Sequence, residues 1–306
     1  MEKQVIVRIC SGLGNQMFQM ACGMATAAKL GATLACDTTW YPLVSGFHRP
    51  VRQFRLGHLL LPTGEAFRGV RRLAVGLMSA LYDRTGRGGG LLQQAGNMVL
   101  IQERQAMRSQ RLDCPDDARR IYLNGYWQTA DHFLAIREPL LPLLAPRNGI
   151  SGEARHWVDR IQSRQTCFVH VRRGDYAELV GDSGLLPVEY YRRAAATVTD
   201  RLGEDVQWIV FAEDHAWARQ NMGFLPGWQL VDYASDQRDI EDLQLMAACD
   251  AGIIANSSYS WWGAAMGDRA GRLIIAPDRY WNRGGADTTA WRLPSWQAVT
   301  AWPDPA

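Results

Sequence analysis

The sequence predicts an α/β protein built from two Rossmann-like domains with largely parallel sheets. Strand-like apolar runs alternate with helical runs along most of the 306 residues, which is the pattern of βα units. A Gly-x-Gly turn follows the first strand-like run, as in a nucleotide-binding half. A Pro- and Gly-containing stretch, Pro146–Gly149, separates two such series, so we predict domains at 1–146 and 147–306.

The N-terminal half opens with a Val- and Ile-rich run that predicts a strand, and the apolar residues after the glycine turn predict a helix. The alternation loosens between about residues 42 and 115, where Gly86–Gly90 predicts a hinge or loop. The predicted elements are strand Gln4–Ile9, helix Gln16–Leu30, strand Ala32–Cys36, basic helix Phe67–Tyr82, strand Ile121–Leu123 and a helix ending at Ile136.

The C-terminal half alternates more regularly. Ser151 predicts the N-cap of its first helix, with Glu153 in the first turn. Strands are predicted at Thr166–Val171, Gln207–Phe211, Gln229–Val231, Gly252–Ala255 and Arg272–Ile275. Helices are predicted at Val188–Leu202, His215–Asn221, Asp239–Ala248 and Trp261–Gly267.

Composition excludes several classes of protein. The formal net charge of +2 is too small for a general nucleic-acid binder. The six cysteines contain no Cys-x-x-Cys pair, which favours buried thiols in a reducing compartment over disulfides or a zinc site. The N-terminus lacks the pattern of a secretion signal, and Leu73–Tyr82 is too short to span a bilayer. We expect a cytoplasmic protein.

The end of the strand Thr166–Val171 carries the most informative pair, Arg172 and Arg173. Open α/β sheets bind ligands just past the carboxyl ends of their strands. Arginine binds planar oxyanions through two parallel hydrogen bonds, so phosphate is the expected ligand. The alternative is a solvated ion pair with Asp175 and Glu178.

The first βα turn contains Gly12 and Gly14, which allow a phosphate to approach a helix N-terminus. Asp37 imitates the ribose-binding acid of a dinucleotide fold, but Met17 occupies the place of the third glycine. An NAD-type oxidoreductase is therefore a weak alternative, and a simple tight turn explains the glycines equally well.

A third segment places Asp242 near a helix start and Asn256-Ser257-Ser258 between a strand and a helix. The serines could cap that helix, and its free N–H groups could hold an anion. The alternatives are capping alone for the serines and interaction with the helix dipole for Asp242.

Five blocks stand in order between the first strand and about residue 265: Gly12-Leu13-Gly14-Asn15-Gln16-Met17-Phe18-Gln19, Leu123-Asn124-Gly125-Tyr126-Trp127-Gln128, His170-Val171-Arg172-Arg173-Gly174-Asp175-Tyr176, Val210-Phe211-Ala212-Glu213-Asp214 and Asn256-Ser257-Ser258-Tyr259-Ser260-Trp261-Trp262-Gly263. Together they resemble the motifs of bacterial α-1,2-fucosyltransferases of glycosyltransferase family 11. Tyr259 stands where that family more often has Phe.

The resemblance implies a GT-B-like fold whose two Rossmann-like domains face a central cleft, with the acceptor side at 1–146 and GDP-β-L-fucose bound by 147–306. Arg172 would hold the β-phosphate, with His170 near the nucleotide, and Asp242 would pair with guanine. Asn256, Ser257 and Ser258 would contact the pyrophosphate or ribose. Gly14 and Asn15 would approach the sugar phosphate from the other domain.

The implied reaction is an inverting transfer of L-fucose to a glycan hydroxyl, expected to be O-2 of a galactoside in surface polysaccharide or O-antigen. A strict Asp-x-Asp motif is absent from the sequence, so we expect no metal and no other cofactor, with Arg172 neutralising the leaving group. Asp175, Glu178 and Asp37 are alternative bases, unless the proton leaves late to phosphate or water.

Three points stay open. The donor could be another GDP- or NDP-deoxysugar, or the chain could bind a nucleotide sugar without turnover. The basic segment Arg68–Arg72 and the apolar run after it could contact an anionic inner membrane, or form an ordinary surface helix with one buried stripe. Residues 42–115 resemble the family least, so the acceptor rests on analogy.

Overall fold

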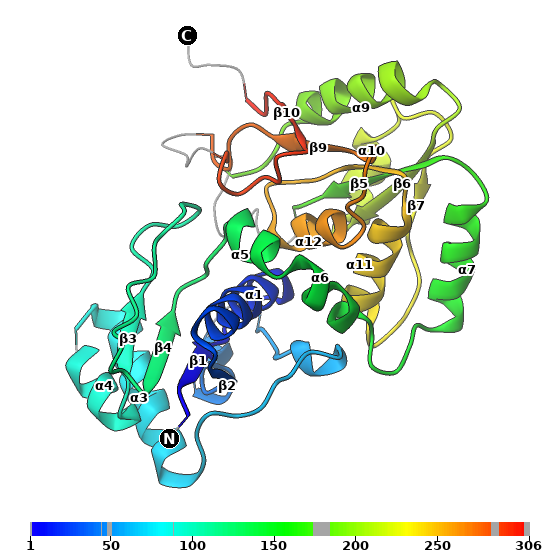
Figure 1. The fold of residues 1–306 in the computed structure, drawn as a ribbon. Helices are drawn as coiled ribbons and strands as arrows, with labels where there is room; N and C mark the ends of the chain where they lie inside the picture. Colours follow the sequence, from blue (N-terminus) through cyan, green and yellow to red (C-terminus); the bar gives the residue numbers. More distant parts are fainter. Residues whose placement is uncertain are drawn as a thin grey trace. The chain divides into compact units, whose positions relative to one another are not determined.

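The computed structural model describes residues 2–302, apart from residues 44, 48–50, 88, 174–183 and 283–287. The chain divides into two compact units, Met1–Ala145 and Pro146–Ala306, and each contains one parallel sheet (Figure 1). The division falls one residue before the boundary that the Pro and Gly cluster suggested.

The sheet of the N-terminal unit has the order β2-β1-β4-β3, and all three strand pairs are parallel. The order reverses between β1 and β4, which makes their carboxyl ends the switch point of this sheet. Its strands are β1 Gln4–Arg8, β2 Thr33–Asp37, β3 Val99–Gln102 and β4 Arg120–Asn124.

Helices cover both faces of this sheet. Alternate residues of β1 point to opposite sides, and both sides carry buried apolar residues. Val7 lies against Gly23 of α1, whereas Ile6 belongs to the cluster that contains Val75 of α3. The helices of the unit are α1 Leu13–Leu30, α2 Trp40–Leu43, η1 Ser45–Phe47, η2 Leu56–His58, α3 Gly69–Thr85, α4 Gly89–Gly96, α5 Ala130–Ala135, α6 Arg137–Leu140 and η3 Leu141–Leu144.

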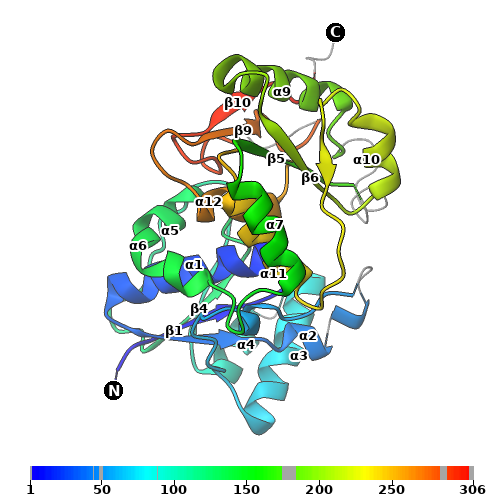
Figure 2. The same ribbon diagram turned by 90° about the vertical axis from the view of Figure 1, so that its right-hand side faces the viewer.

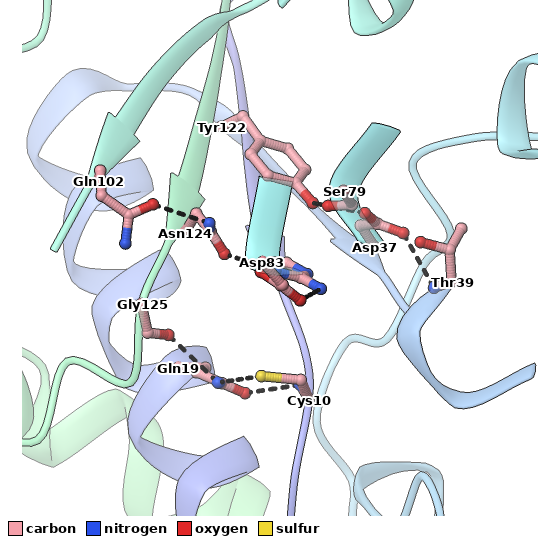
Figure 3. Close-up of polar contacts among 11 residues, drawn as sticks. Cys10, Gln19, Asp37, Thr39, Ser79, Asp83, Gln102, Tyr122, Asn124 and Gly125 are labelled. Atoms are coloured by element: carbon pink, nitrogen blue, oxygen red, sulfur yellow. Dashed lines mark hydrogen bonds and ion pairs between the residues drawn. The ribbon is translucent and has the colours of Figure 1, made fainter. Parts of the chain in front are cut away.

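A polar network lies between this sheet and α3 (Figure 3). The buried guanidinium of Arg8 donates to Asp83 at 2.5 Å and to Asn124 at 3.0 Å. Fully buried Asp37 accepts from the hydroxyl of Tyr122 at 2.6 Å and from the backbone N–H of Thr39 at 2.9 Å. These contacts give Asp37 a structural role, so the suggested base and ribose-binding roles find no support.

The sheet of the C-terminal unit has the order β10-β9-β8-β5-β6-β7, again with every pair parallel. The chain runs outward from β5 through β6 and β7, then returns to the other side of β5 with β8. The switch point therefore lies between β5 and β8. The strands are β5 Thr166–Val171, β6 Gln207–Ala212, β7 Gln229–Leu230, β8 Ala251–Ile253, β9 Leu273–Pro277 and β10 Gln297–Val299.

Alternate residues of β5 again serve two faces. Val169 packs in the core with Tyr190 of α9 and Ala218 of α10, while the ring of His170 faces Tyr259 of α12. The helices of this unit are α7 Gly152–Gln162, α9 Val188–Leu202, α10 His215–Asn221, α11 Arg238–Ala248 and α12 Ser258–Met266; Figure 2 shows α7 beside α11.

Most predicted elements are present, and the differences occur at the ends of elements, in the segment 42–115 and at the edge strand β10. Helix α1 begins at Leu13, three residues before the predicted start, with Gly12 at its N-cap. The predicted loop at Gly86–Gly90 is short: Gly86 ends α3 with a φ of 64°, and α4 begins at Gly89. Strands β3 and β10 were not predicted. Among the described residues, no helix combines the length and apolar character that crossing a membrane requires.

Candidate functional site

The candidate site lies at the carboxyl edge of the sheet in the C-terminal unit. Residues His170 and Arg172 stand at the end of β5, and Asn256–Ser258 follow the end of β8, so the two groups flank the switch point. Open α/β sheets bind ligands at this position, outside the carboxyl ends of the strands. Topology thus brings two motifs together that are about 85 residues apart.

Arg172 forms an ion pair through Nη1 with the carboxylate of Glu213, which follows β6. The Arg172 side chain is only 15% exposed, whereas that of Glu213 is 51% exposed. Sequence reasoning quoted the block around Glu213 but gave this residue no role. The alternative partners Asp175 and Glu178 lie outside the described residues.

Arg173 has a different environment although it is the next residue. Its guanidinium carbon lies 4.4 Å from the centroid of the Trp217 ring, a cation–π contact with helix α10. The two adjacent arginines therefore have different partners. Arg172 pairs with a residue at the end of the neighbouring strand, whereas Arg173 packs on a helix.

His170 is 5% exposed, and burial together with the charge of Arg172 lowers its pKa to about 3. The imidazole is therefore neutral at physiological pH and adds no charge beside Arg172. Its centroid lies 5.6 Å from that of the Tyr259 ring. Its Nδ1 atom is buried and has no hydrogen-bond partner within the described parts of the chain.

Ser257 is the N-cap of α12, where its Oγ accepts a hydrogen bond from the backbone N–H of Tyr259 at 3.3 Å. The Tyr259 hydroxyl donates to the carbonyl of Asp239 at 2.6 Å, which ties α12 to the start of α11. Ser258 is the first residue of α12 and is half-buried. Capping therefore accounts for Ser257, while Ser258 lies at the positive end of the helix dipole.

Asn256 is almost fully buried and joins two other segments. Its Nδ2 donates to the carbonyls of Gly184 and Tyr280, both at 2.8 Å. Its Oδ1 is buried without a hydrogen-bond partner among the described residues. The contacts on this side chain are structural, and its predicted contact with the nucleotide stays a prediction.

Asp242 lies in the first part of α11, with its side chain 15% exposed. Burial raises the pKa of this carboxyl to about 7, opposed by the charge of Arg238 and the hydrogen bond from Tyr233. The Tyr233 hydroxyl donates to Oδ1 at 3.2 Å, and Nε of Arg238 lies 3.5 Å from Oδ2. The group can thus change between an acceptor and a donor near neutral pH.

Sequence reasoning missed the polar residues that surround Asp242. Arg238 also donates to the carbonyls of Tyr233 at 3.1 Å and Val231 at 2.6 Å. Asp232, two residues after β7, lies 3.4 Å from Nδ1 of His215 and 3.8 Å from Nη1 of Arg238. The helix predicted at Asp239–Ala248 begins one residue after Arg238, so the i,i+4 spacing of Arg238 and Asp242 is the one sequence signal that could have indicated this pair.

The glycine turn belongs to the N-terminal unit. Ser11 there has a φ of 67°, and its Oγ accepts from Nδ2 of Asn15 at 3.0 Å. Gln128, in the loop after β4, donates to Oδ1 of Asn15 at 2.5 Å. Gly14 lies buried in the first turn of α1. Asn15 therefore connects the turn to the loop of the neighbouring strand.

Arginine also lies beside this turn. A Cβ atom at Gly12 would lie 3.8 Å from Nη1 of Arg52, so the guanidinium passes close to the backbone of the turn.

The predicted base Asp175 is outside the described residues. Within the described residues, His, Cys, Asp and Glu side chains form no group of three that could hold a metal ion.

The known proteins that this chain resembles agree with its α/β topology of two parallel sheets. The chain matches the model of Glycosyl transferase family 11 over residues 97–299. The O-antigen biosynthesis glycosyltransferase WbnK of Escherichia coli is 25% identical over 94% of this chain and 98% of its own length. An alpha-1,2-colitosyltransferase of Escherichia coli is 25% identical over 91% of this chain and 93% of its own length.

Among solved structures, the NodZ alpha-1,6-fucosyltransferase soaked with GDP-fucose is similar with a TM-score of 0.52 and 17% identity. The likeness covers 94% of this chain and 99% of that one. At this identity the likeness shows the fold alone, and the fold is the GT-B fold that the family resemblance implied.

Proposed function

Because this chain belongs to glycosyl transferase family 11, it is a glycosyltransferase, and we propose that its donor is GDP-β-L-fucose and its acceptor atom O-2 of a galactoside. One relative is named for O-antigen biosynthesis and another for an alpha-1,2 linkage, which supports this choice of glycan class and linkage. The product would be part of O-antigen or another surface polysaccharide.

The observation that carries the proposal is the setting of Arg172 at the switch point. Negative charge grows on the β-phosphate as the bond to fucose breaks, and a fixed guanidinium beside it lowers the barrier. The phosphate would replace the carboxylate of Glu213, a half-exposed partner whose ion pair contributes little stability. Because His170 is neutral, the positive charge beside that phosphate would come from Arg172 and not from the imidazole.

The N-terminus of α12 would assist Arg172. Its first N–H groups carry partial positive charge, and Ser257 and Ser258 stand at this end. Together these groups would neutralise the charge on the leaving phosphate, which a metal ion does in other nucleotide-sugar enzymes. The acceptor hydroxyl would attack from the opposite face of the anomeric carbon and invert it, with Asp175 as the proposed base.

Asp242 would select the base of the donor. An ionised carboxylate accepts two hydrogen bonds side by side, and guanine presents two adjacent N–H donors on its pairing edge. Uracil and thymine present a single N–H on that edge. We therefore expect GDP to raise the Tm of the protein more than UDP or dTDP does.

A second donor is favoured by one relative, which is named a colitosyltransferase. Colitose differs from fucose by the absence of the 3-hydroxyl, so the phosphate and guanine contacts proposed above would serve both sugars. The donor sugar itself must be decided by its own measurement.

The test is GDP release from purified protein given GDP-fucose, or the GDP-linked 3-deoxy analogue, with a panel of galactosides. Turnover of GDP-fucose with a terminal galactoside, followed by NMR assignment of an α-1,2 linkage, would support the proposal. Turnover of the 3-deoxy donor alone would replace fucose by colitose. Binding of GDP without turnover on any acceptor of the panel would contradict an enzymatic role with galactosides.

A further inference from the structure

Helix α3 of the N-terminal unit has an exposed apolar face on the side away from its sheet. This α3 outer face consists of Val70, Leu73, Leu77 and Leu81, which are 85%, 53%, 50% and 43% exposed. They follow one another at spacings of three and four residues and so form one stripe. The opposite side of the same helix is buried at Val75, Gly76 and Ser79.

The exposed apolar residues of the chain concentrate here. Nine large hydrophobic side chains are exposed among the described residues, and five of them belong to α3 and α4. The fifth is Leu91 of α4, 54% exposed, on a helix that packs against α3 (Figure 1). Single exposed hydrophobic residues are common, but a stripe of this kind marks an interaction surface.

The charge around the α3 outer face is mainly positive. Between Ala66 and Gln102 the chain contains five arginines and one acidic residue, Asp83. That carboxylate is paired with the buried guanidinium of Arg8 at 2.5 Å, and Arg72 is paired with Glu65 at 3.0 Å. The remaining arginines of the segment are exposed: Arg68, Arg71, Arg84 and Arg87.

We propose that the α3 outer face docks on the surface of an anionic lipid bilayer. A helix with apolar residues on one side and arginines at its flanks lies in the plane of such a surface, with its apolar side toward the acyl chains. Arginine stems pack along the apolar boundary while their guanidinium groups reach the anionic headgroups. A second copy of this chain is disfavoured as the occupant, because docking face to face would bring like charges together.

The inner side of α3 fits this role. The ion pair between Arg8 and Asp83 and the buried residues Val75, Gly76 and Ser79 fix the helix on its own sheet. The stripe is therefore presented by a folded helix, which saves the free energy of ordering it at the membrane. The proposal does not depend on the identity of the donor or the acceptor.

The test is co-sedimentation of the full chain with vesicles of phosphatidylcholine and phosphatidylglycerol in equal parts, against vesicles of phosphatidylcholine alone. We expect binding to the anionic vesicles that weakens as NaCl is raised. The variant Leu73→Ser/Leu77→Ser and the variant Arg68→Gln/Arg84→Gln/Arg87→Gln should each lower the partition coefficient about tenfold. On the vesicles, hydrogen exchange should slow in residues 69–85.

The matched control is Leu60→Ser/Leu134→Ser, which removes two leucines that are 43% and 44% exposed elsewhere in the same unit. It should bind vesicles as the unchanged chain does. Far-UV circular dichroism and GDP release with a soluble acceptor should be equal in all variants, which separates this test from that of the proposed function. Absence of vesicle binding, or equal binding by all variants, overturns the proposal. Dimers in sedimentation velocity that Leu73→Ser/Leu77→Ser abolishes would instead assign the face to a second copy.

Discussion

Arg172 and Arg173 show how little adjacency in sequence determines the role of a side chain. Arg172 follows a residue of β5 that points into the core, and its guanidinium meets a carboxylate at the next strand end. Arg173 turns to the ring of Trp217. Under the proposed function, only Arg172 would exchange its carboxylate partner for a phosphate, so the two residues should respond differently to the same substitution.

Arg172→Lys should lower kcat at least about a hundredfold, because a single ammonium cannot supply the planar pair of donors that a phosphate in the transition state requires. Steady-state GDP release with the unchanged chain as reference measures this. Arg173→Lys is the matched control and should keep kcat within about threefold, because lysine also forms a cation–π contact. Near-normal kcat for Arg172→Lys would remove the role assigned to it.

Asp242 should make the affinity for GDP depend on pH. Burial raises its pKa to about 7 in the free protein, and pairing with guanine needs the ionised form. Below that pKa, GDP binding must first remove a proton, so the association constant should fall about tenfold per pH unit as pH decreases. Above it the association constant should be constant. Calorimetric titration with GDP between pH 5.5 and 8.5, roughly the range around that pKa, measures this.

Asp242→Asn should bind GDP weakly at every pH of that range and lose the slope, since the amide does not ionise and has an NH₂ donor in place of the second acceptor oxygen. The exposed residue Glu204 provides the control, and Glu204→Gln should keep the slope of the unchanged chain. A pH-independent affinity in the unchanged chain would mean that Asp242 does not face the bound base.

At the scale of elements, one ion pair helps to attach α3 to its sheet, beside the buried residues Val75, Gly76 and Ser79. Arg8 is 3% exposed and Asp83 is 36% exposed on its side chain. Removing the carboxylate would leave a buried guanidinium without its anionic partner, a more severe loss than breaking a surface pair. The same pair holds the helix that carries the α3 outer face.

Asp83→Ala should therefore lower the free energy of unfolding by about 2 kcal/mol, below the full value for a buried pair because Asp83 is partly solvated. Urea unfolding followed by circular dichroism measures the change. The exposed pair of Arg111 and Asp113, with side chains 90% and 71% exposed, is the control. Asp113→Ala should change the free energy by less than about 0.5 kcal/mol. Equal effects of the two variants would show that the Arg8 pair is not special.

Elements with a strong local pattern were predictable. Helices α9 and α10 and strand β5 have the predicted bounds, and Ser151 caps α7 by accepting from the N–H of Ala154 at 3.1 Å. Strand β3 was missed because it follows a glycine-rich segment without periodicity. Strand β10 has only three residues and pairs with one edge of the sheet, so its formation depends on β9 more than on its own sequence.

For the molecule as a whole, the family resemblance predicted the fold class, and strand order then placed the motifs. Blocks at β5 and after β8 meet because the sheet order reverses between these strands, which no local pattern encodes. For the same reason the partners Glu213, Tyr233 and Asp83 were not predicted: each contact joins different elements across the fold. Asp37 shows the converse, since its position after a strand imitated a ligand contact while its hydrogen bonds are internal.

Turnover as a whole should survive excess EDTA. The charge on the pyrophosphate group of the leaving GDP would be balanced by Arg172, the N-terminus of α12 and backbone donors, all of which belong to the chain itself. The sequence contains no Asp-x-Asp motif that would bring a divalent ion to the phosphates. Initial rates of GDP release should therefore agree within about twofold with EDTA, with added Mn²⁺ and with neither. A loss of rate in EDTA that Mn²⁺ restores would mean that an ion shares the charge, and Arg172 would then act on the donor beside it.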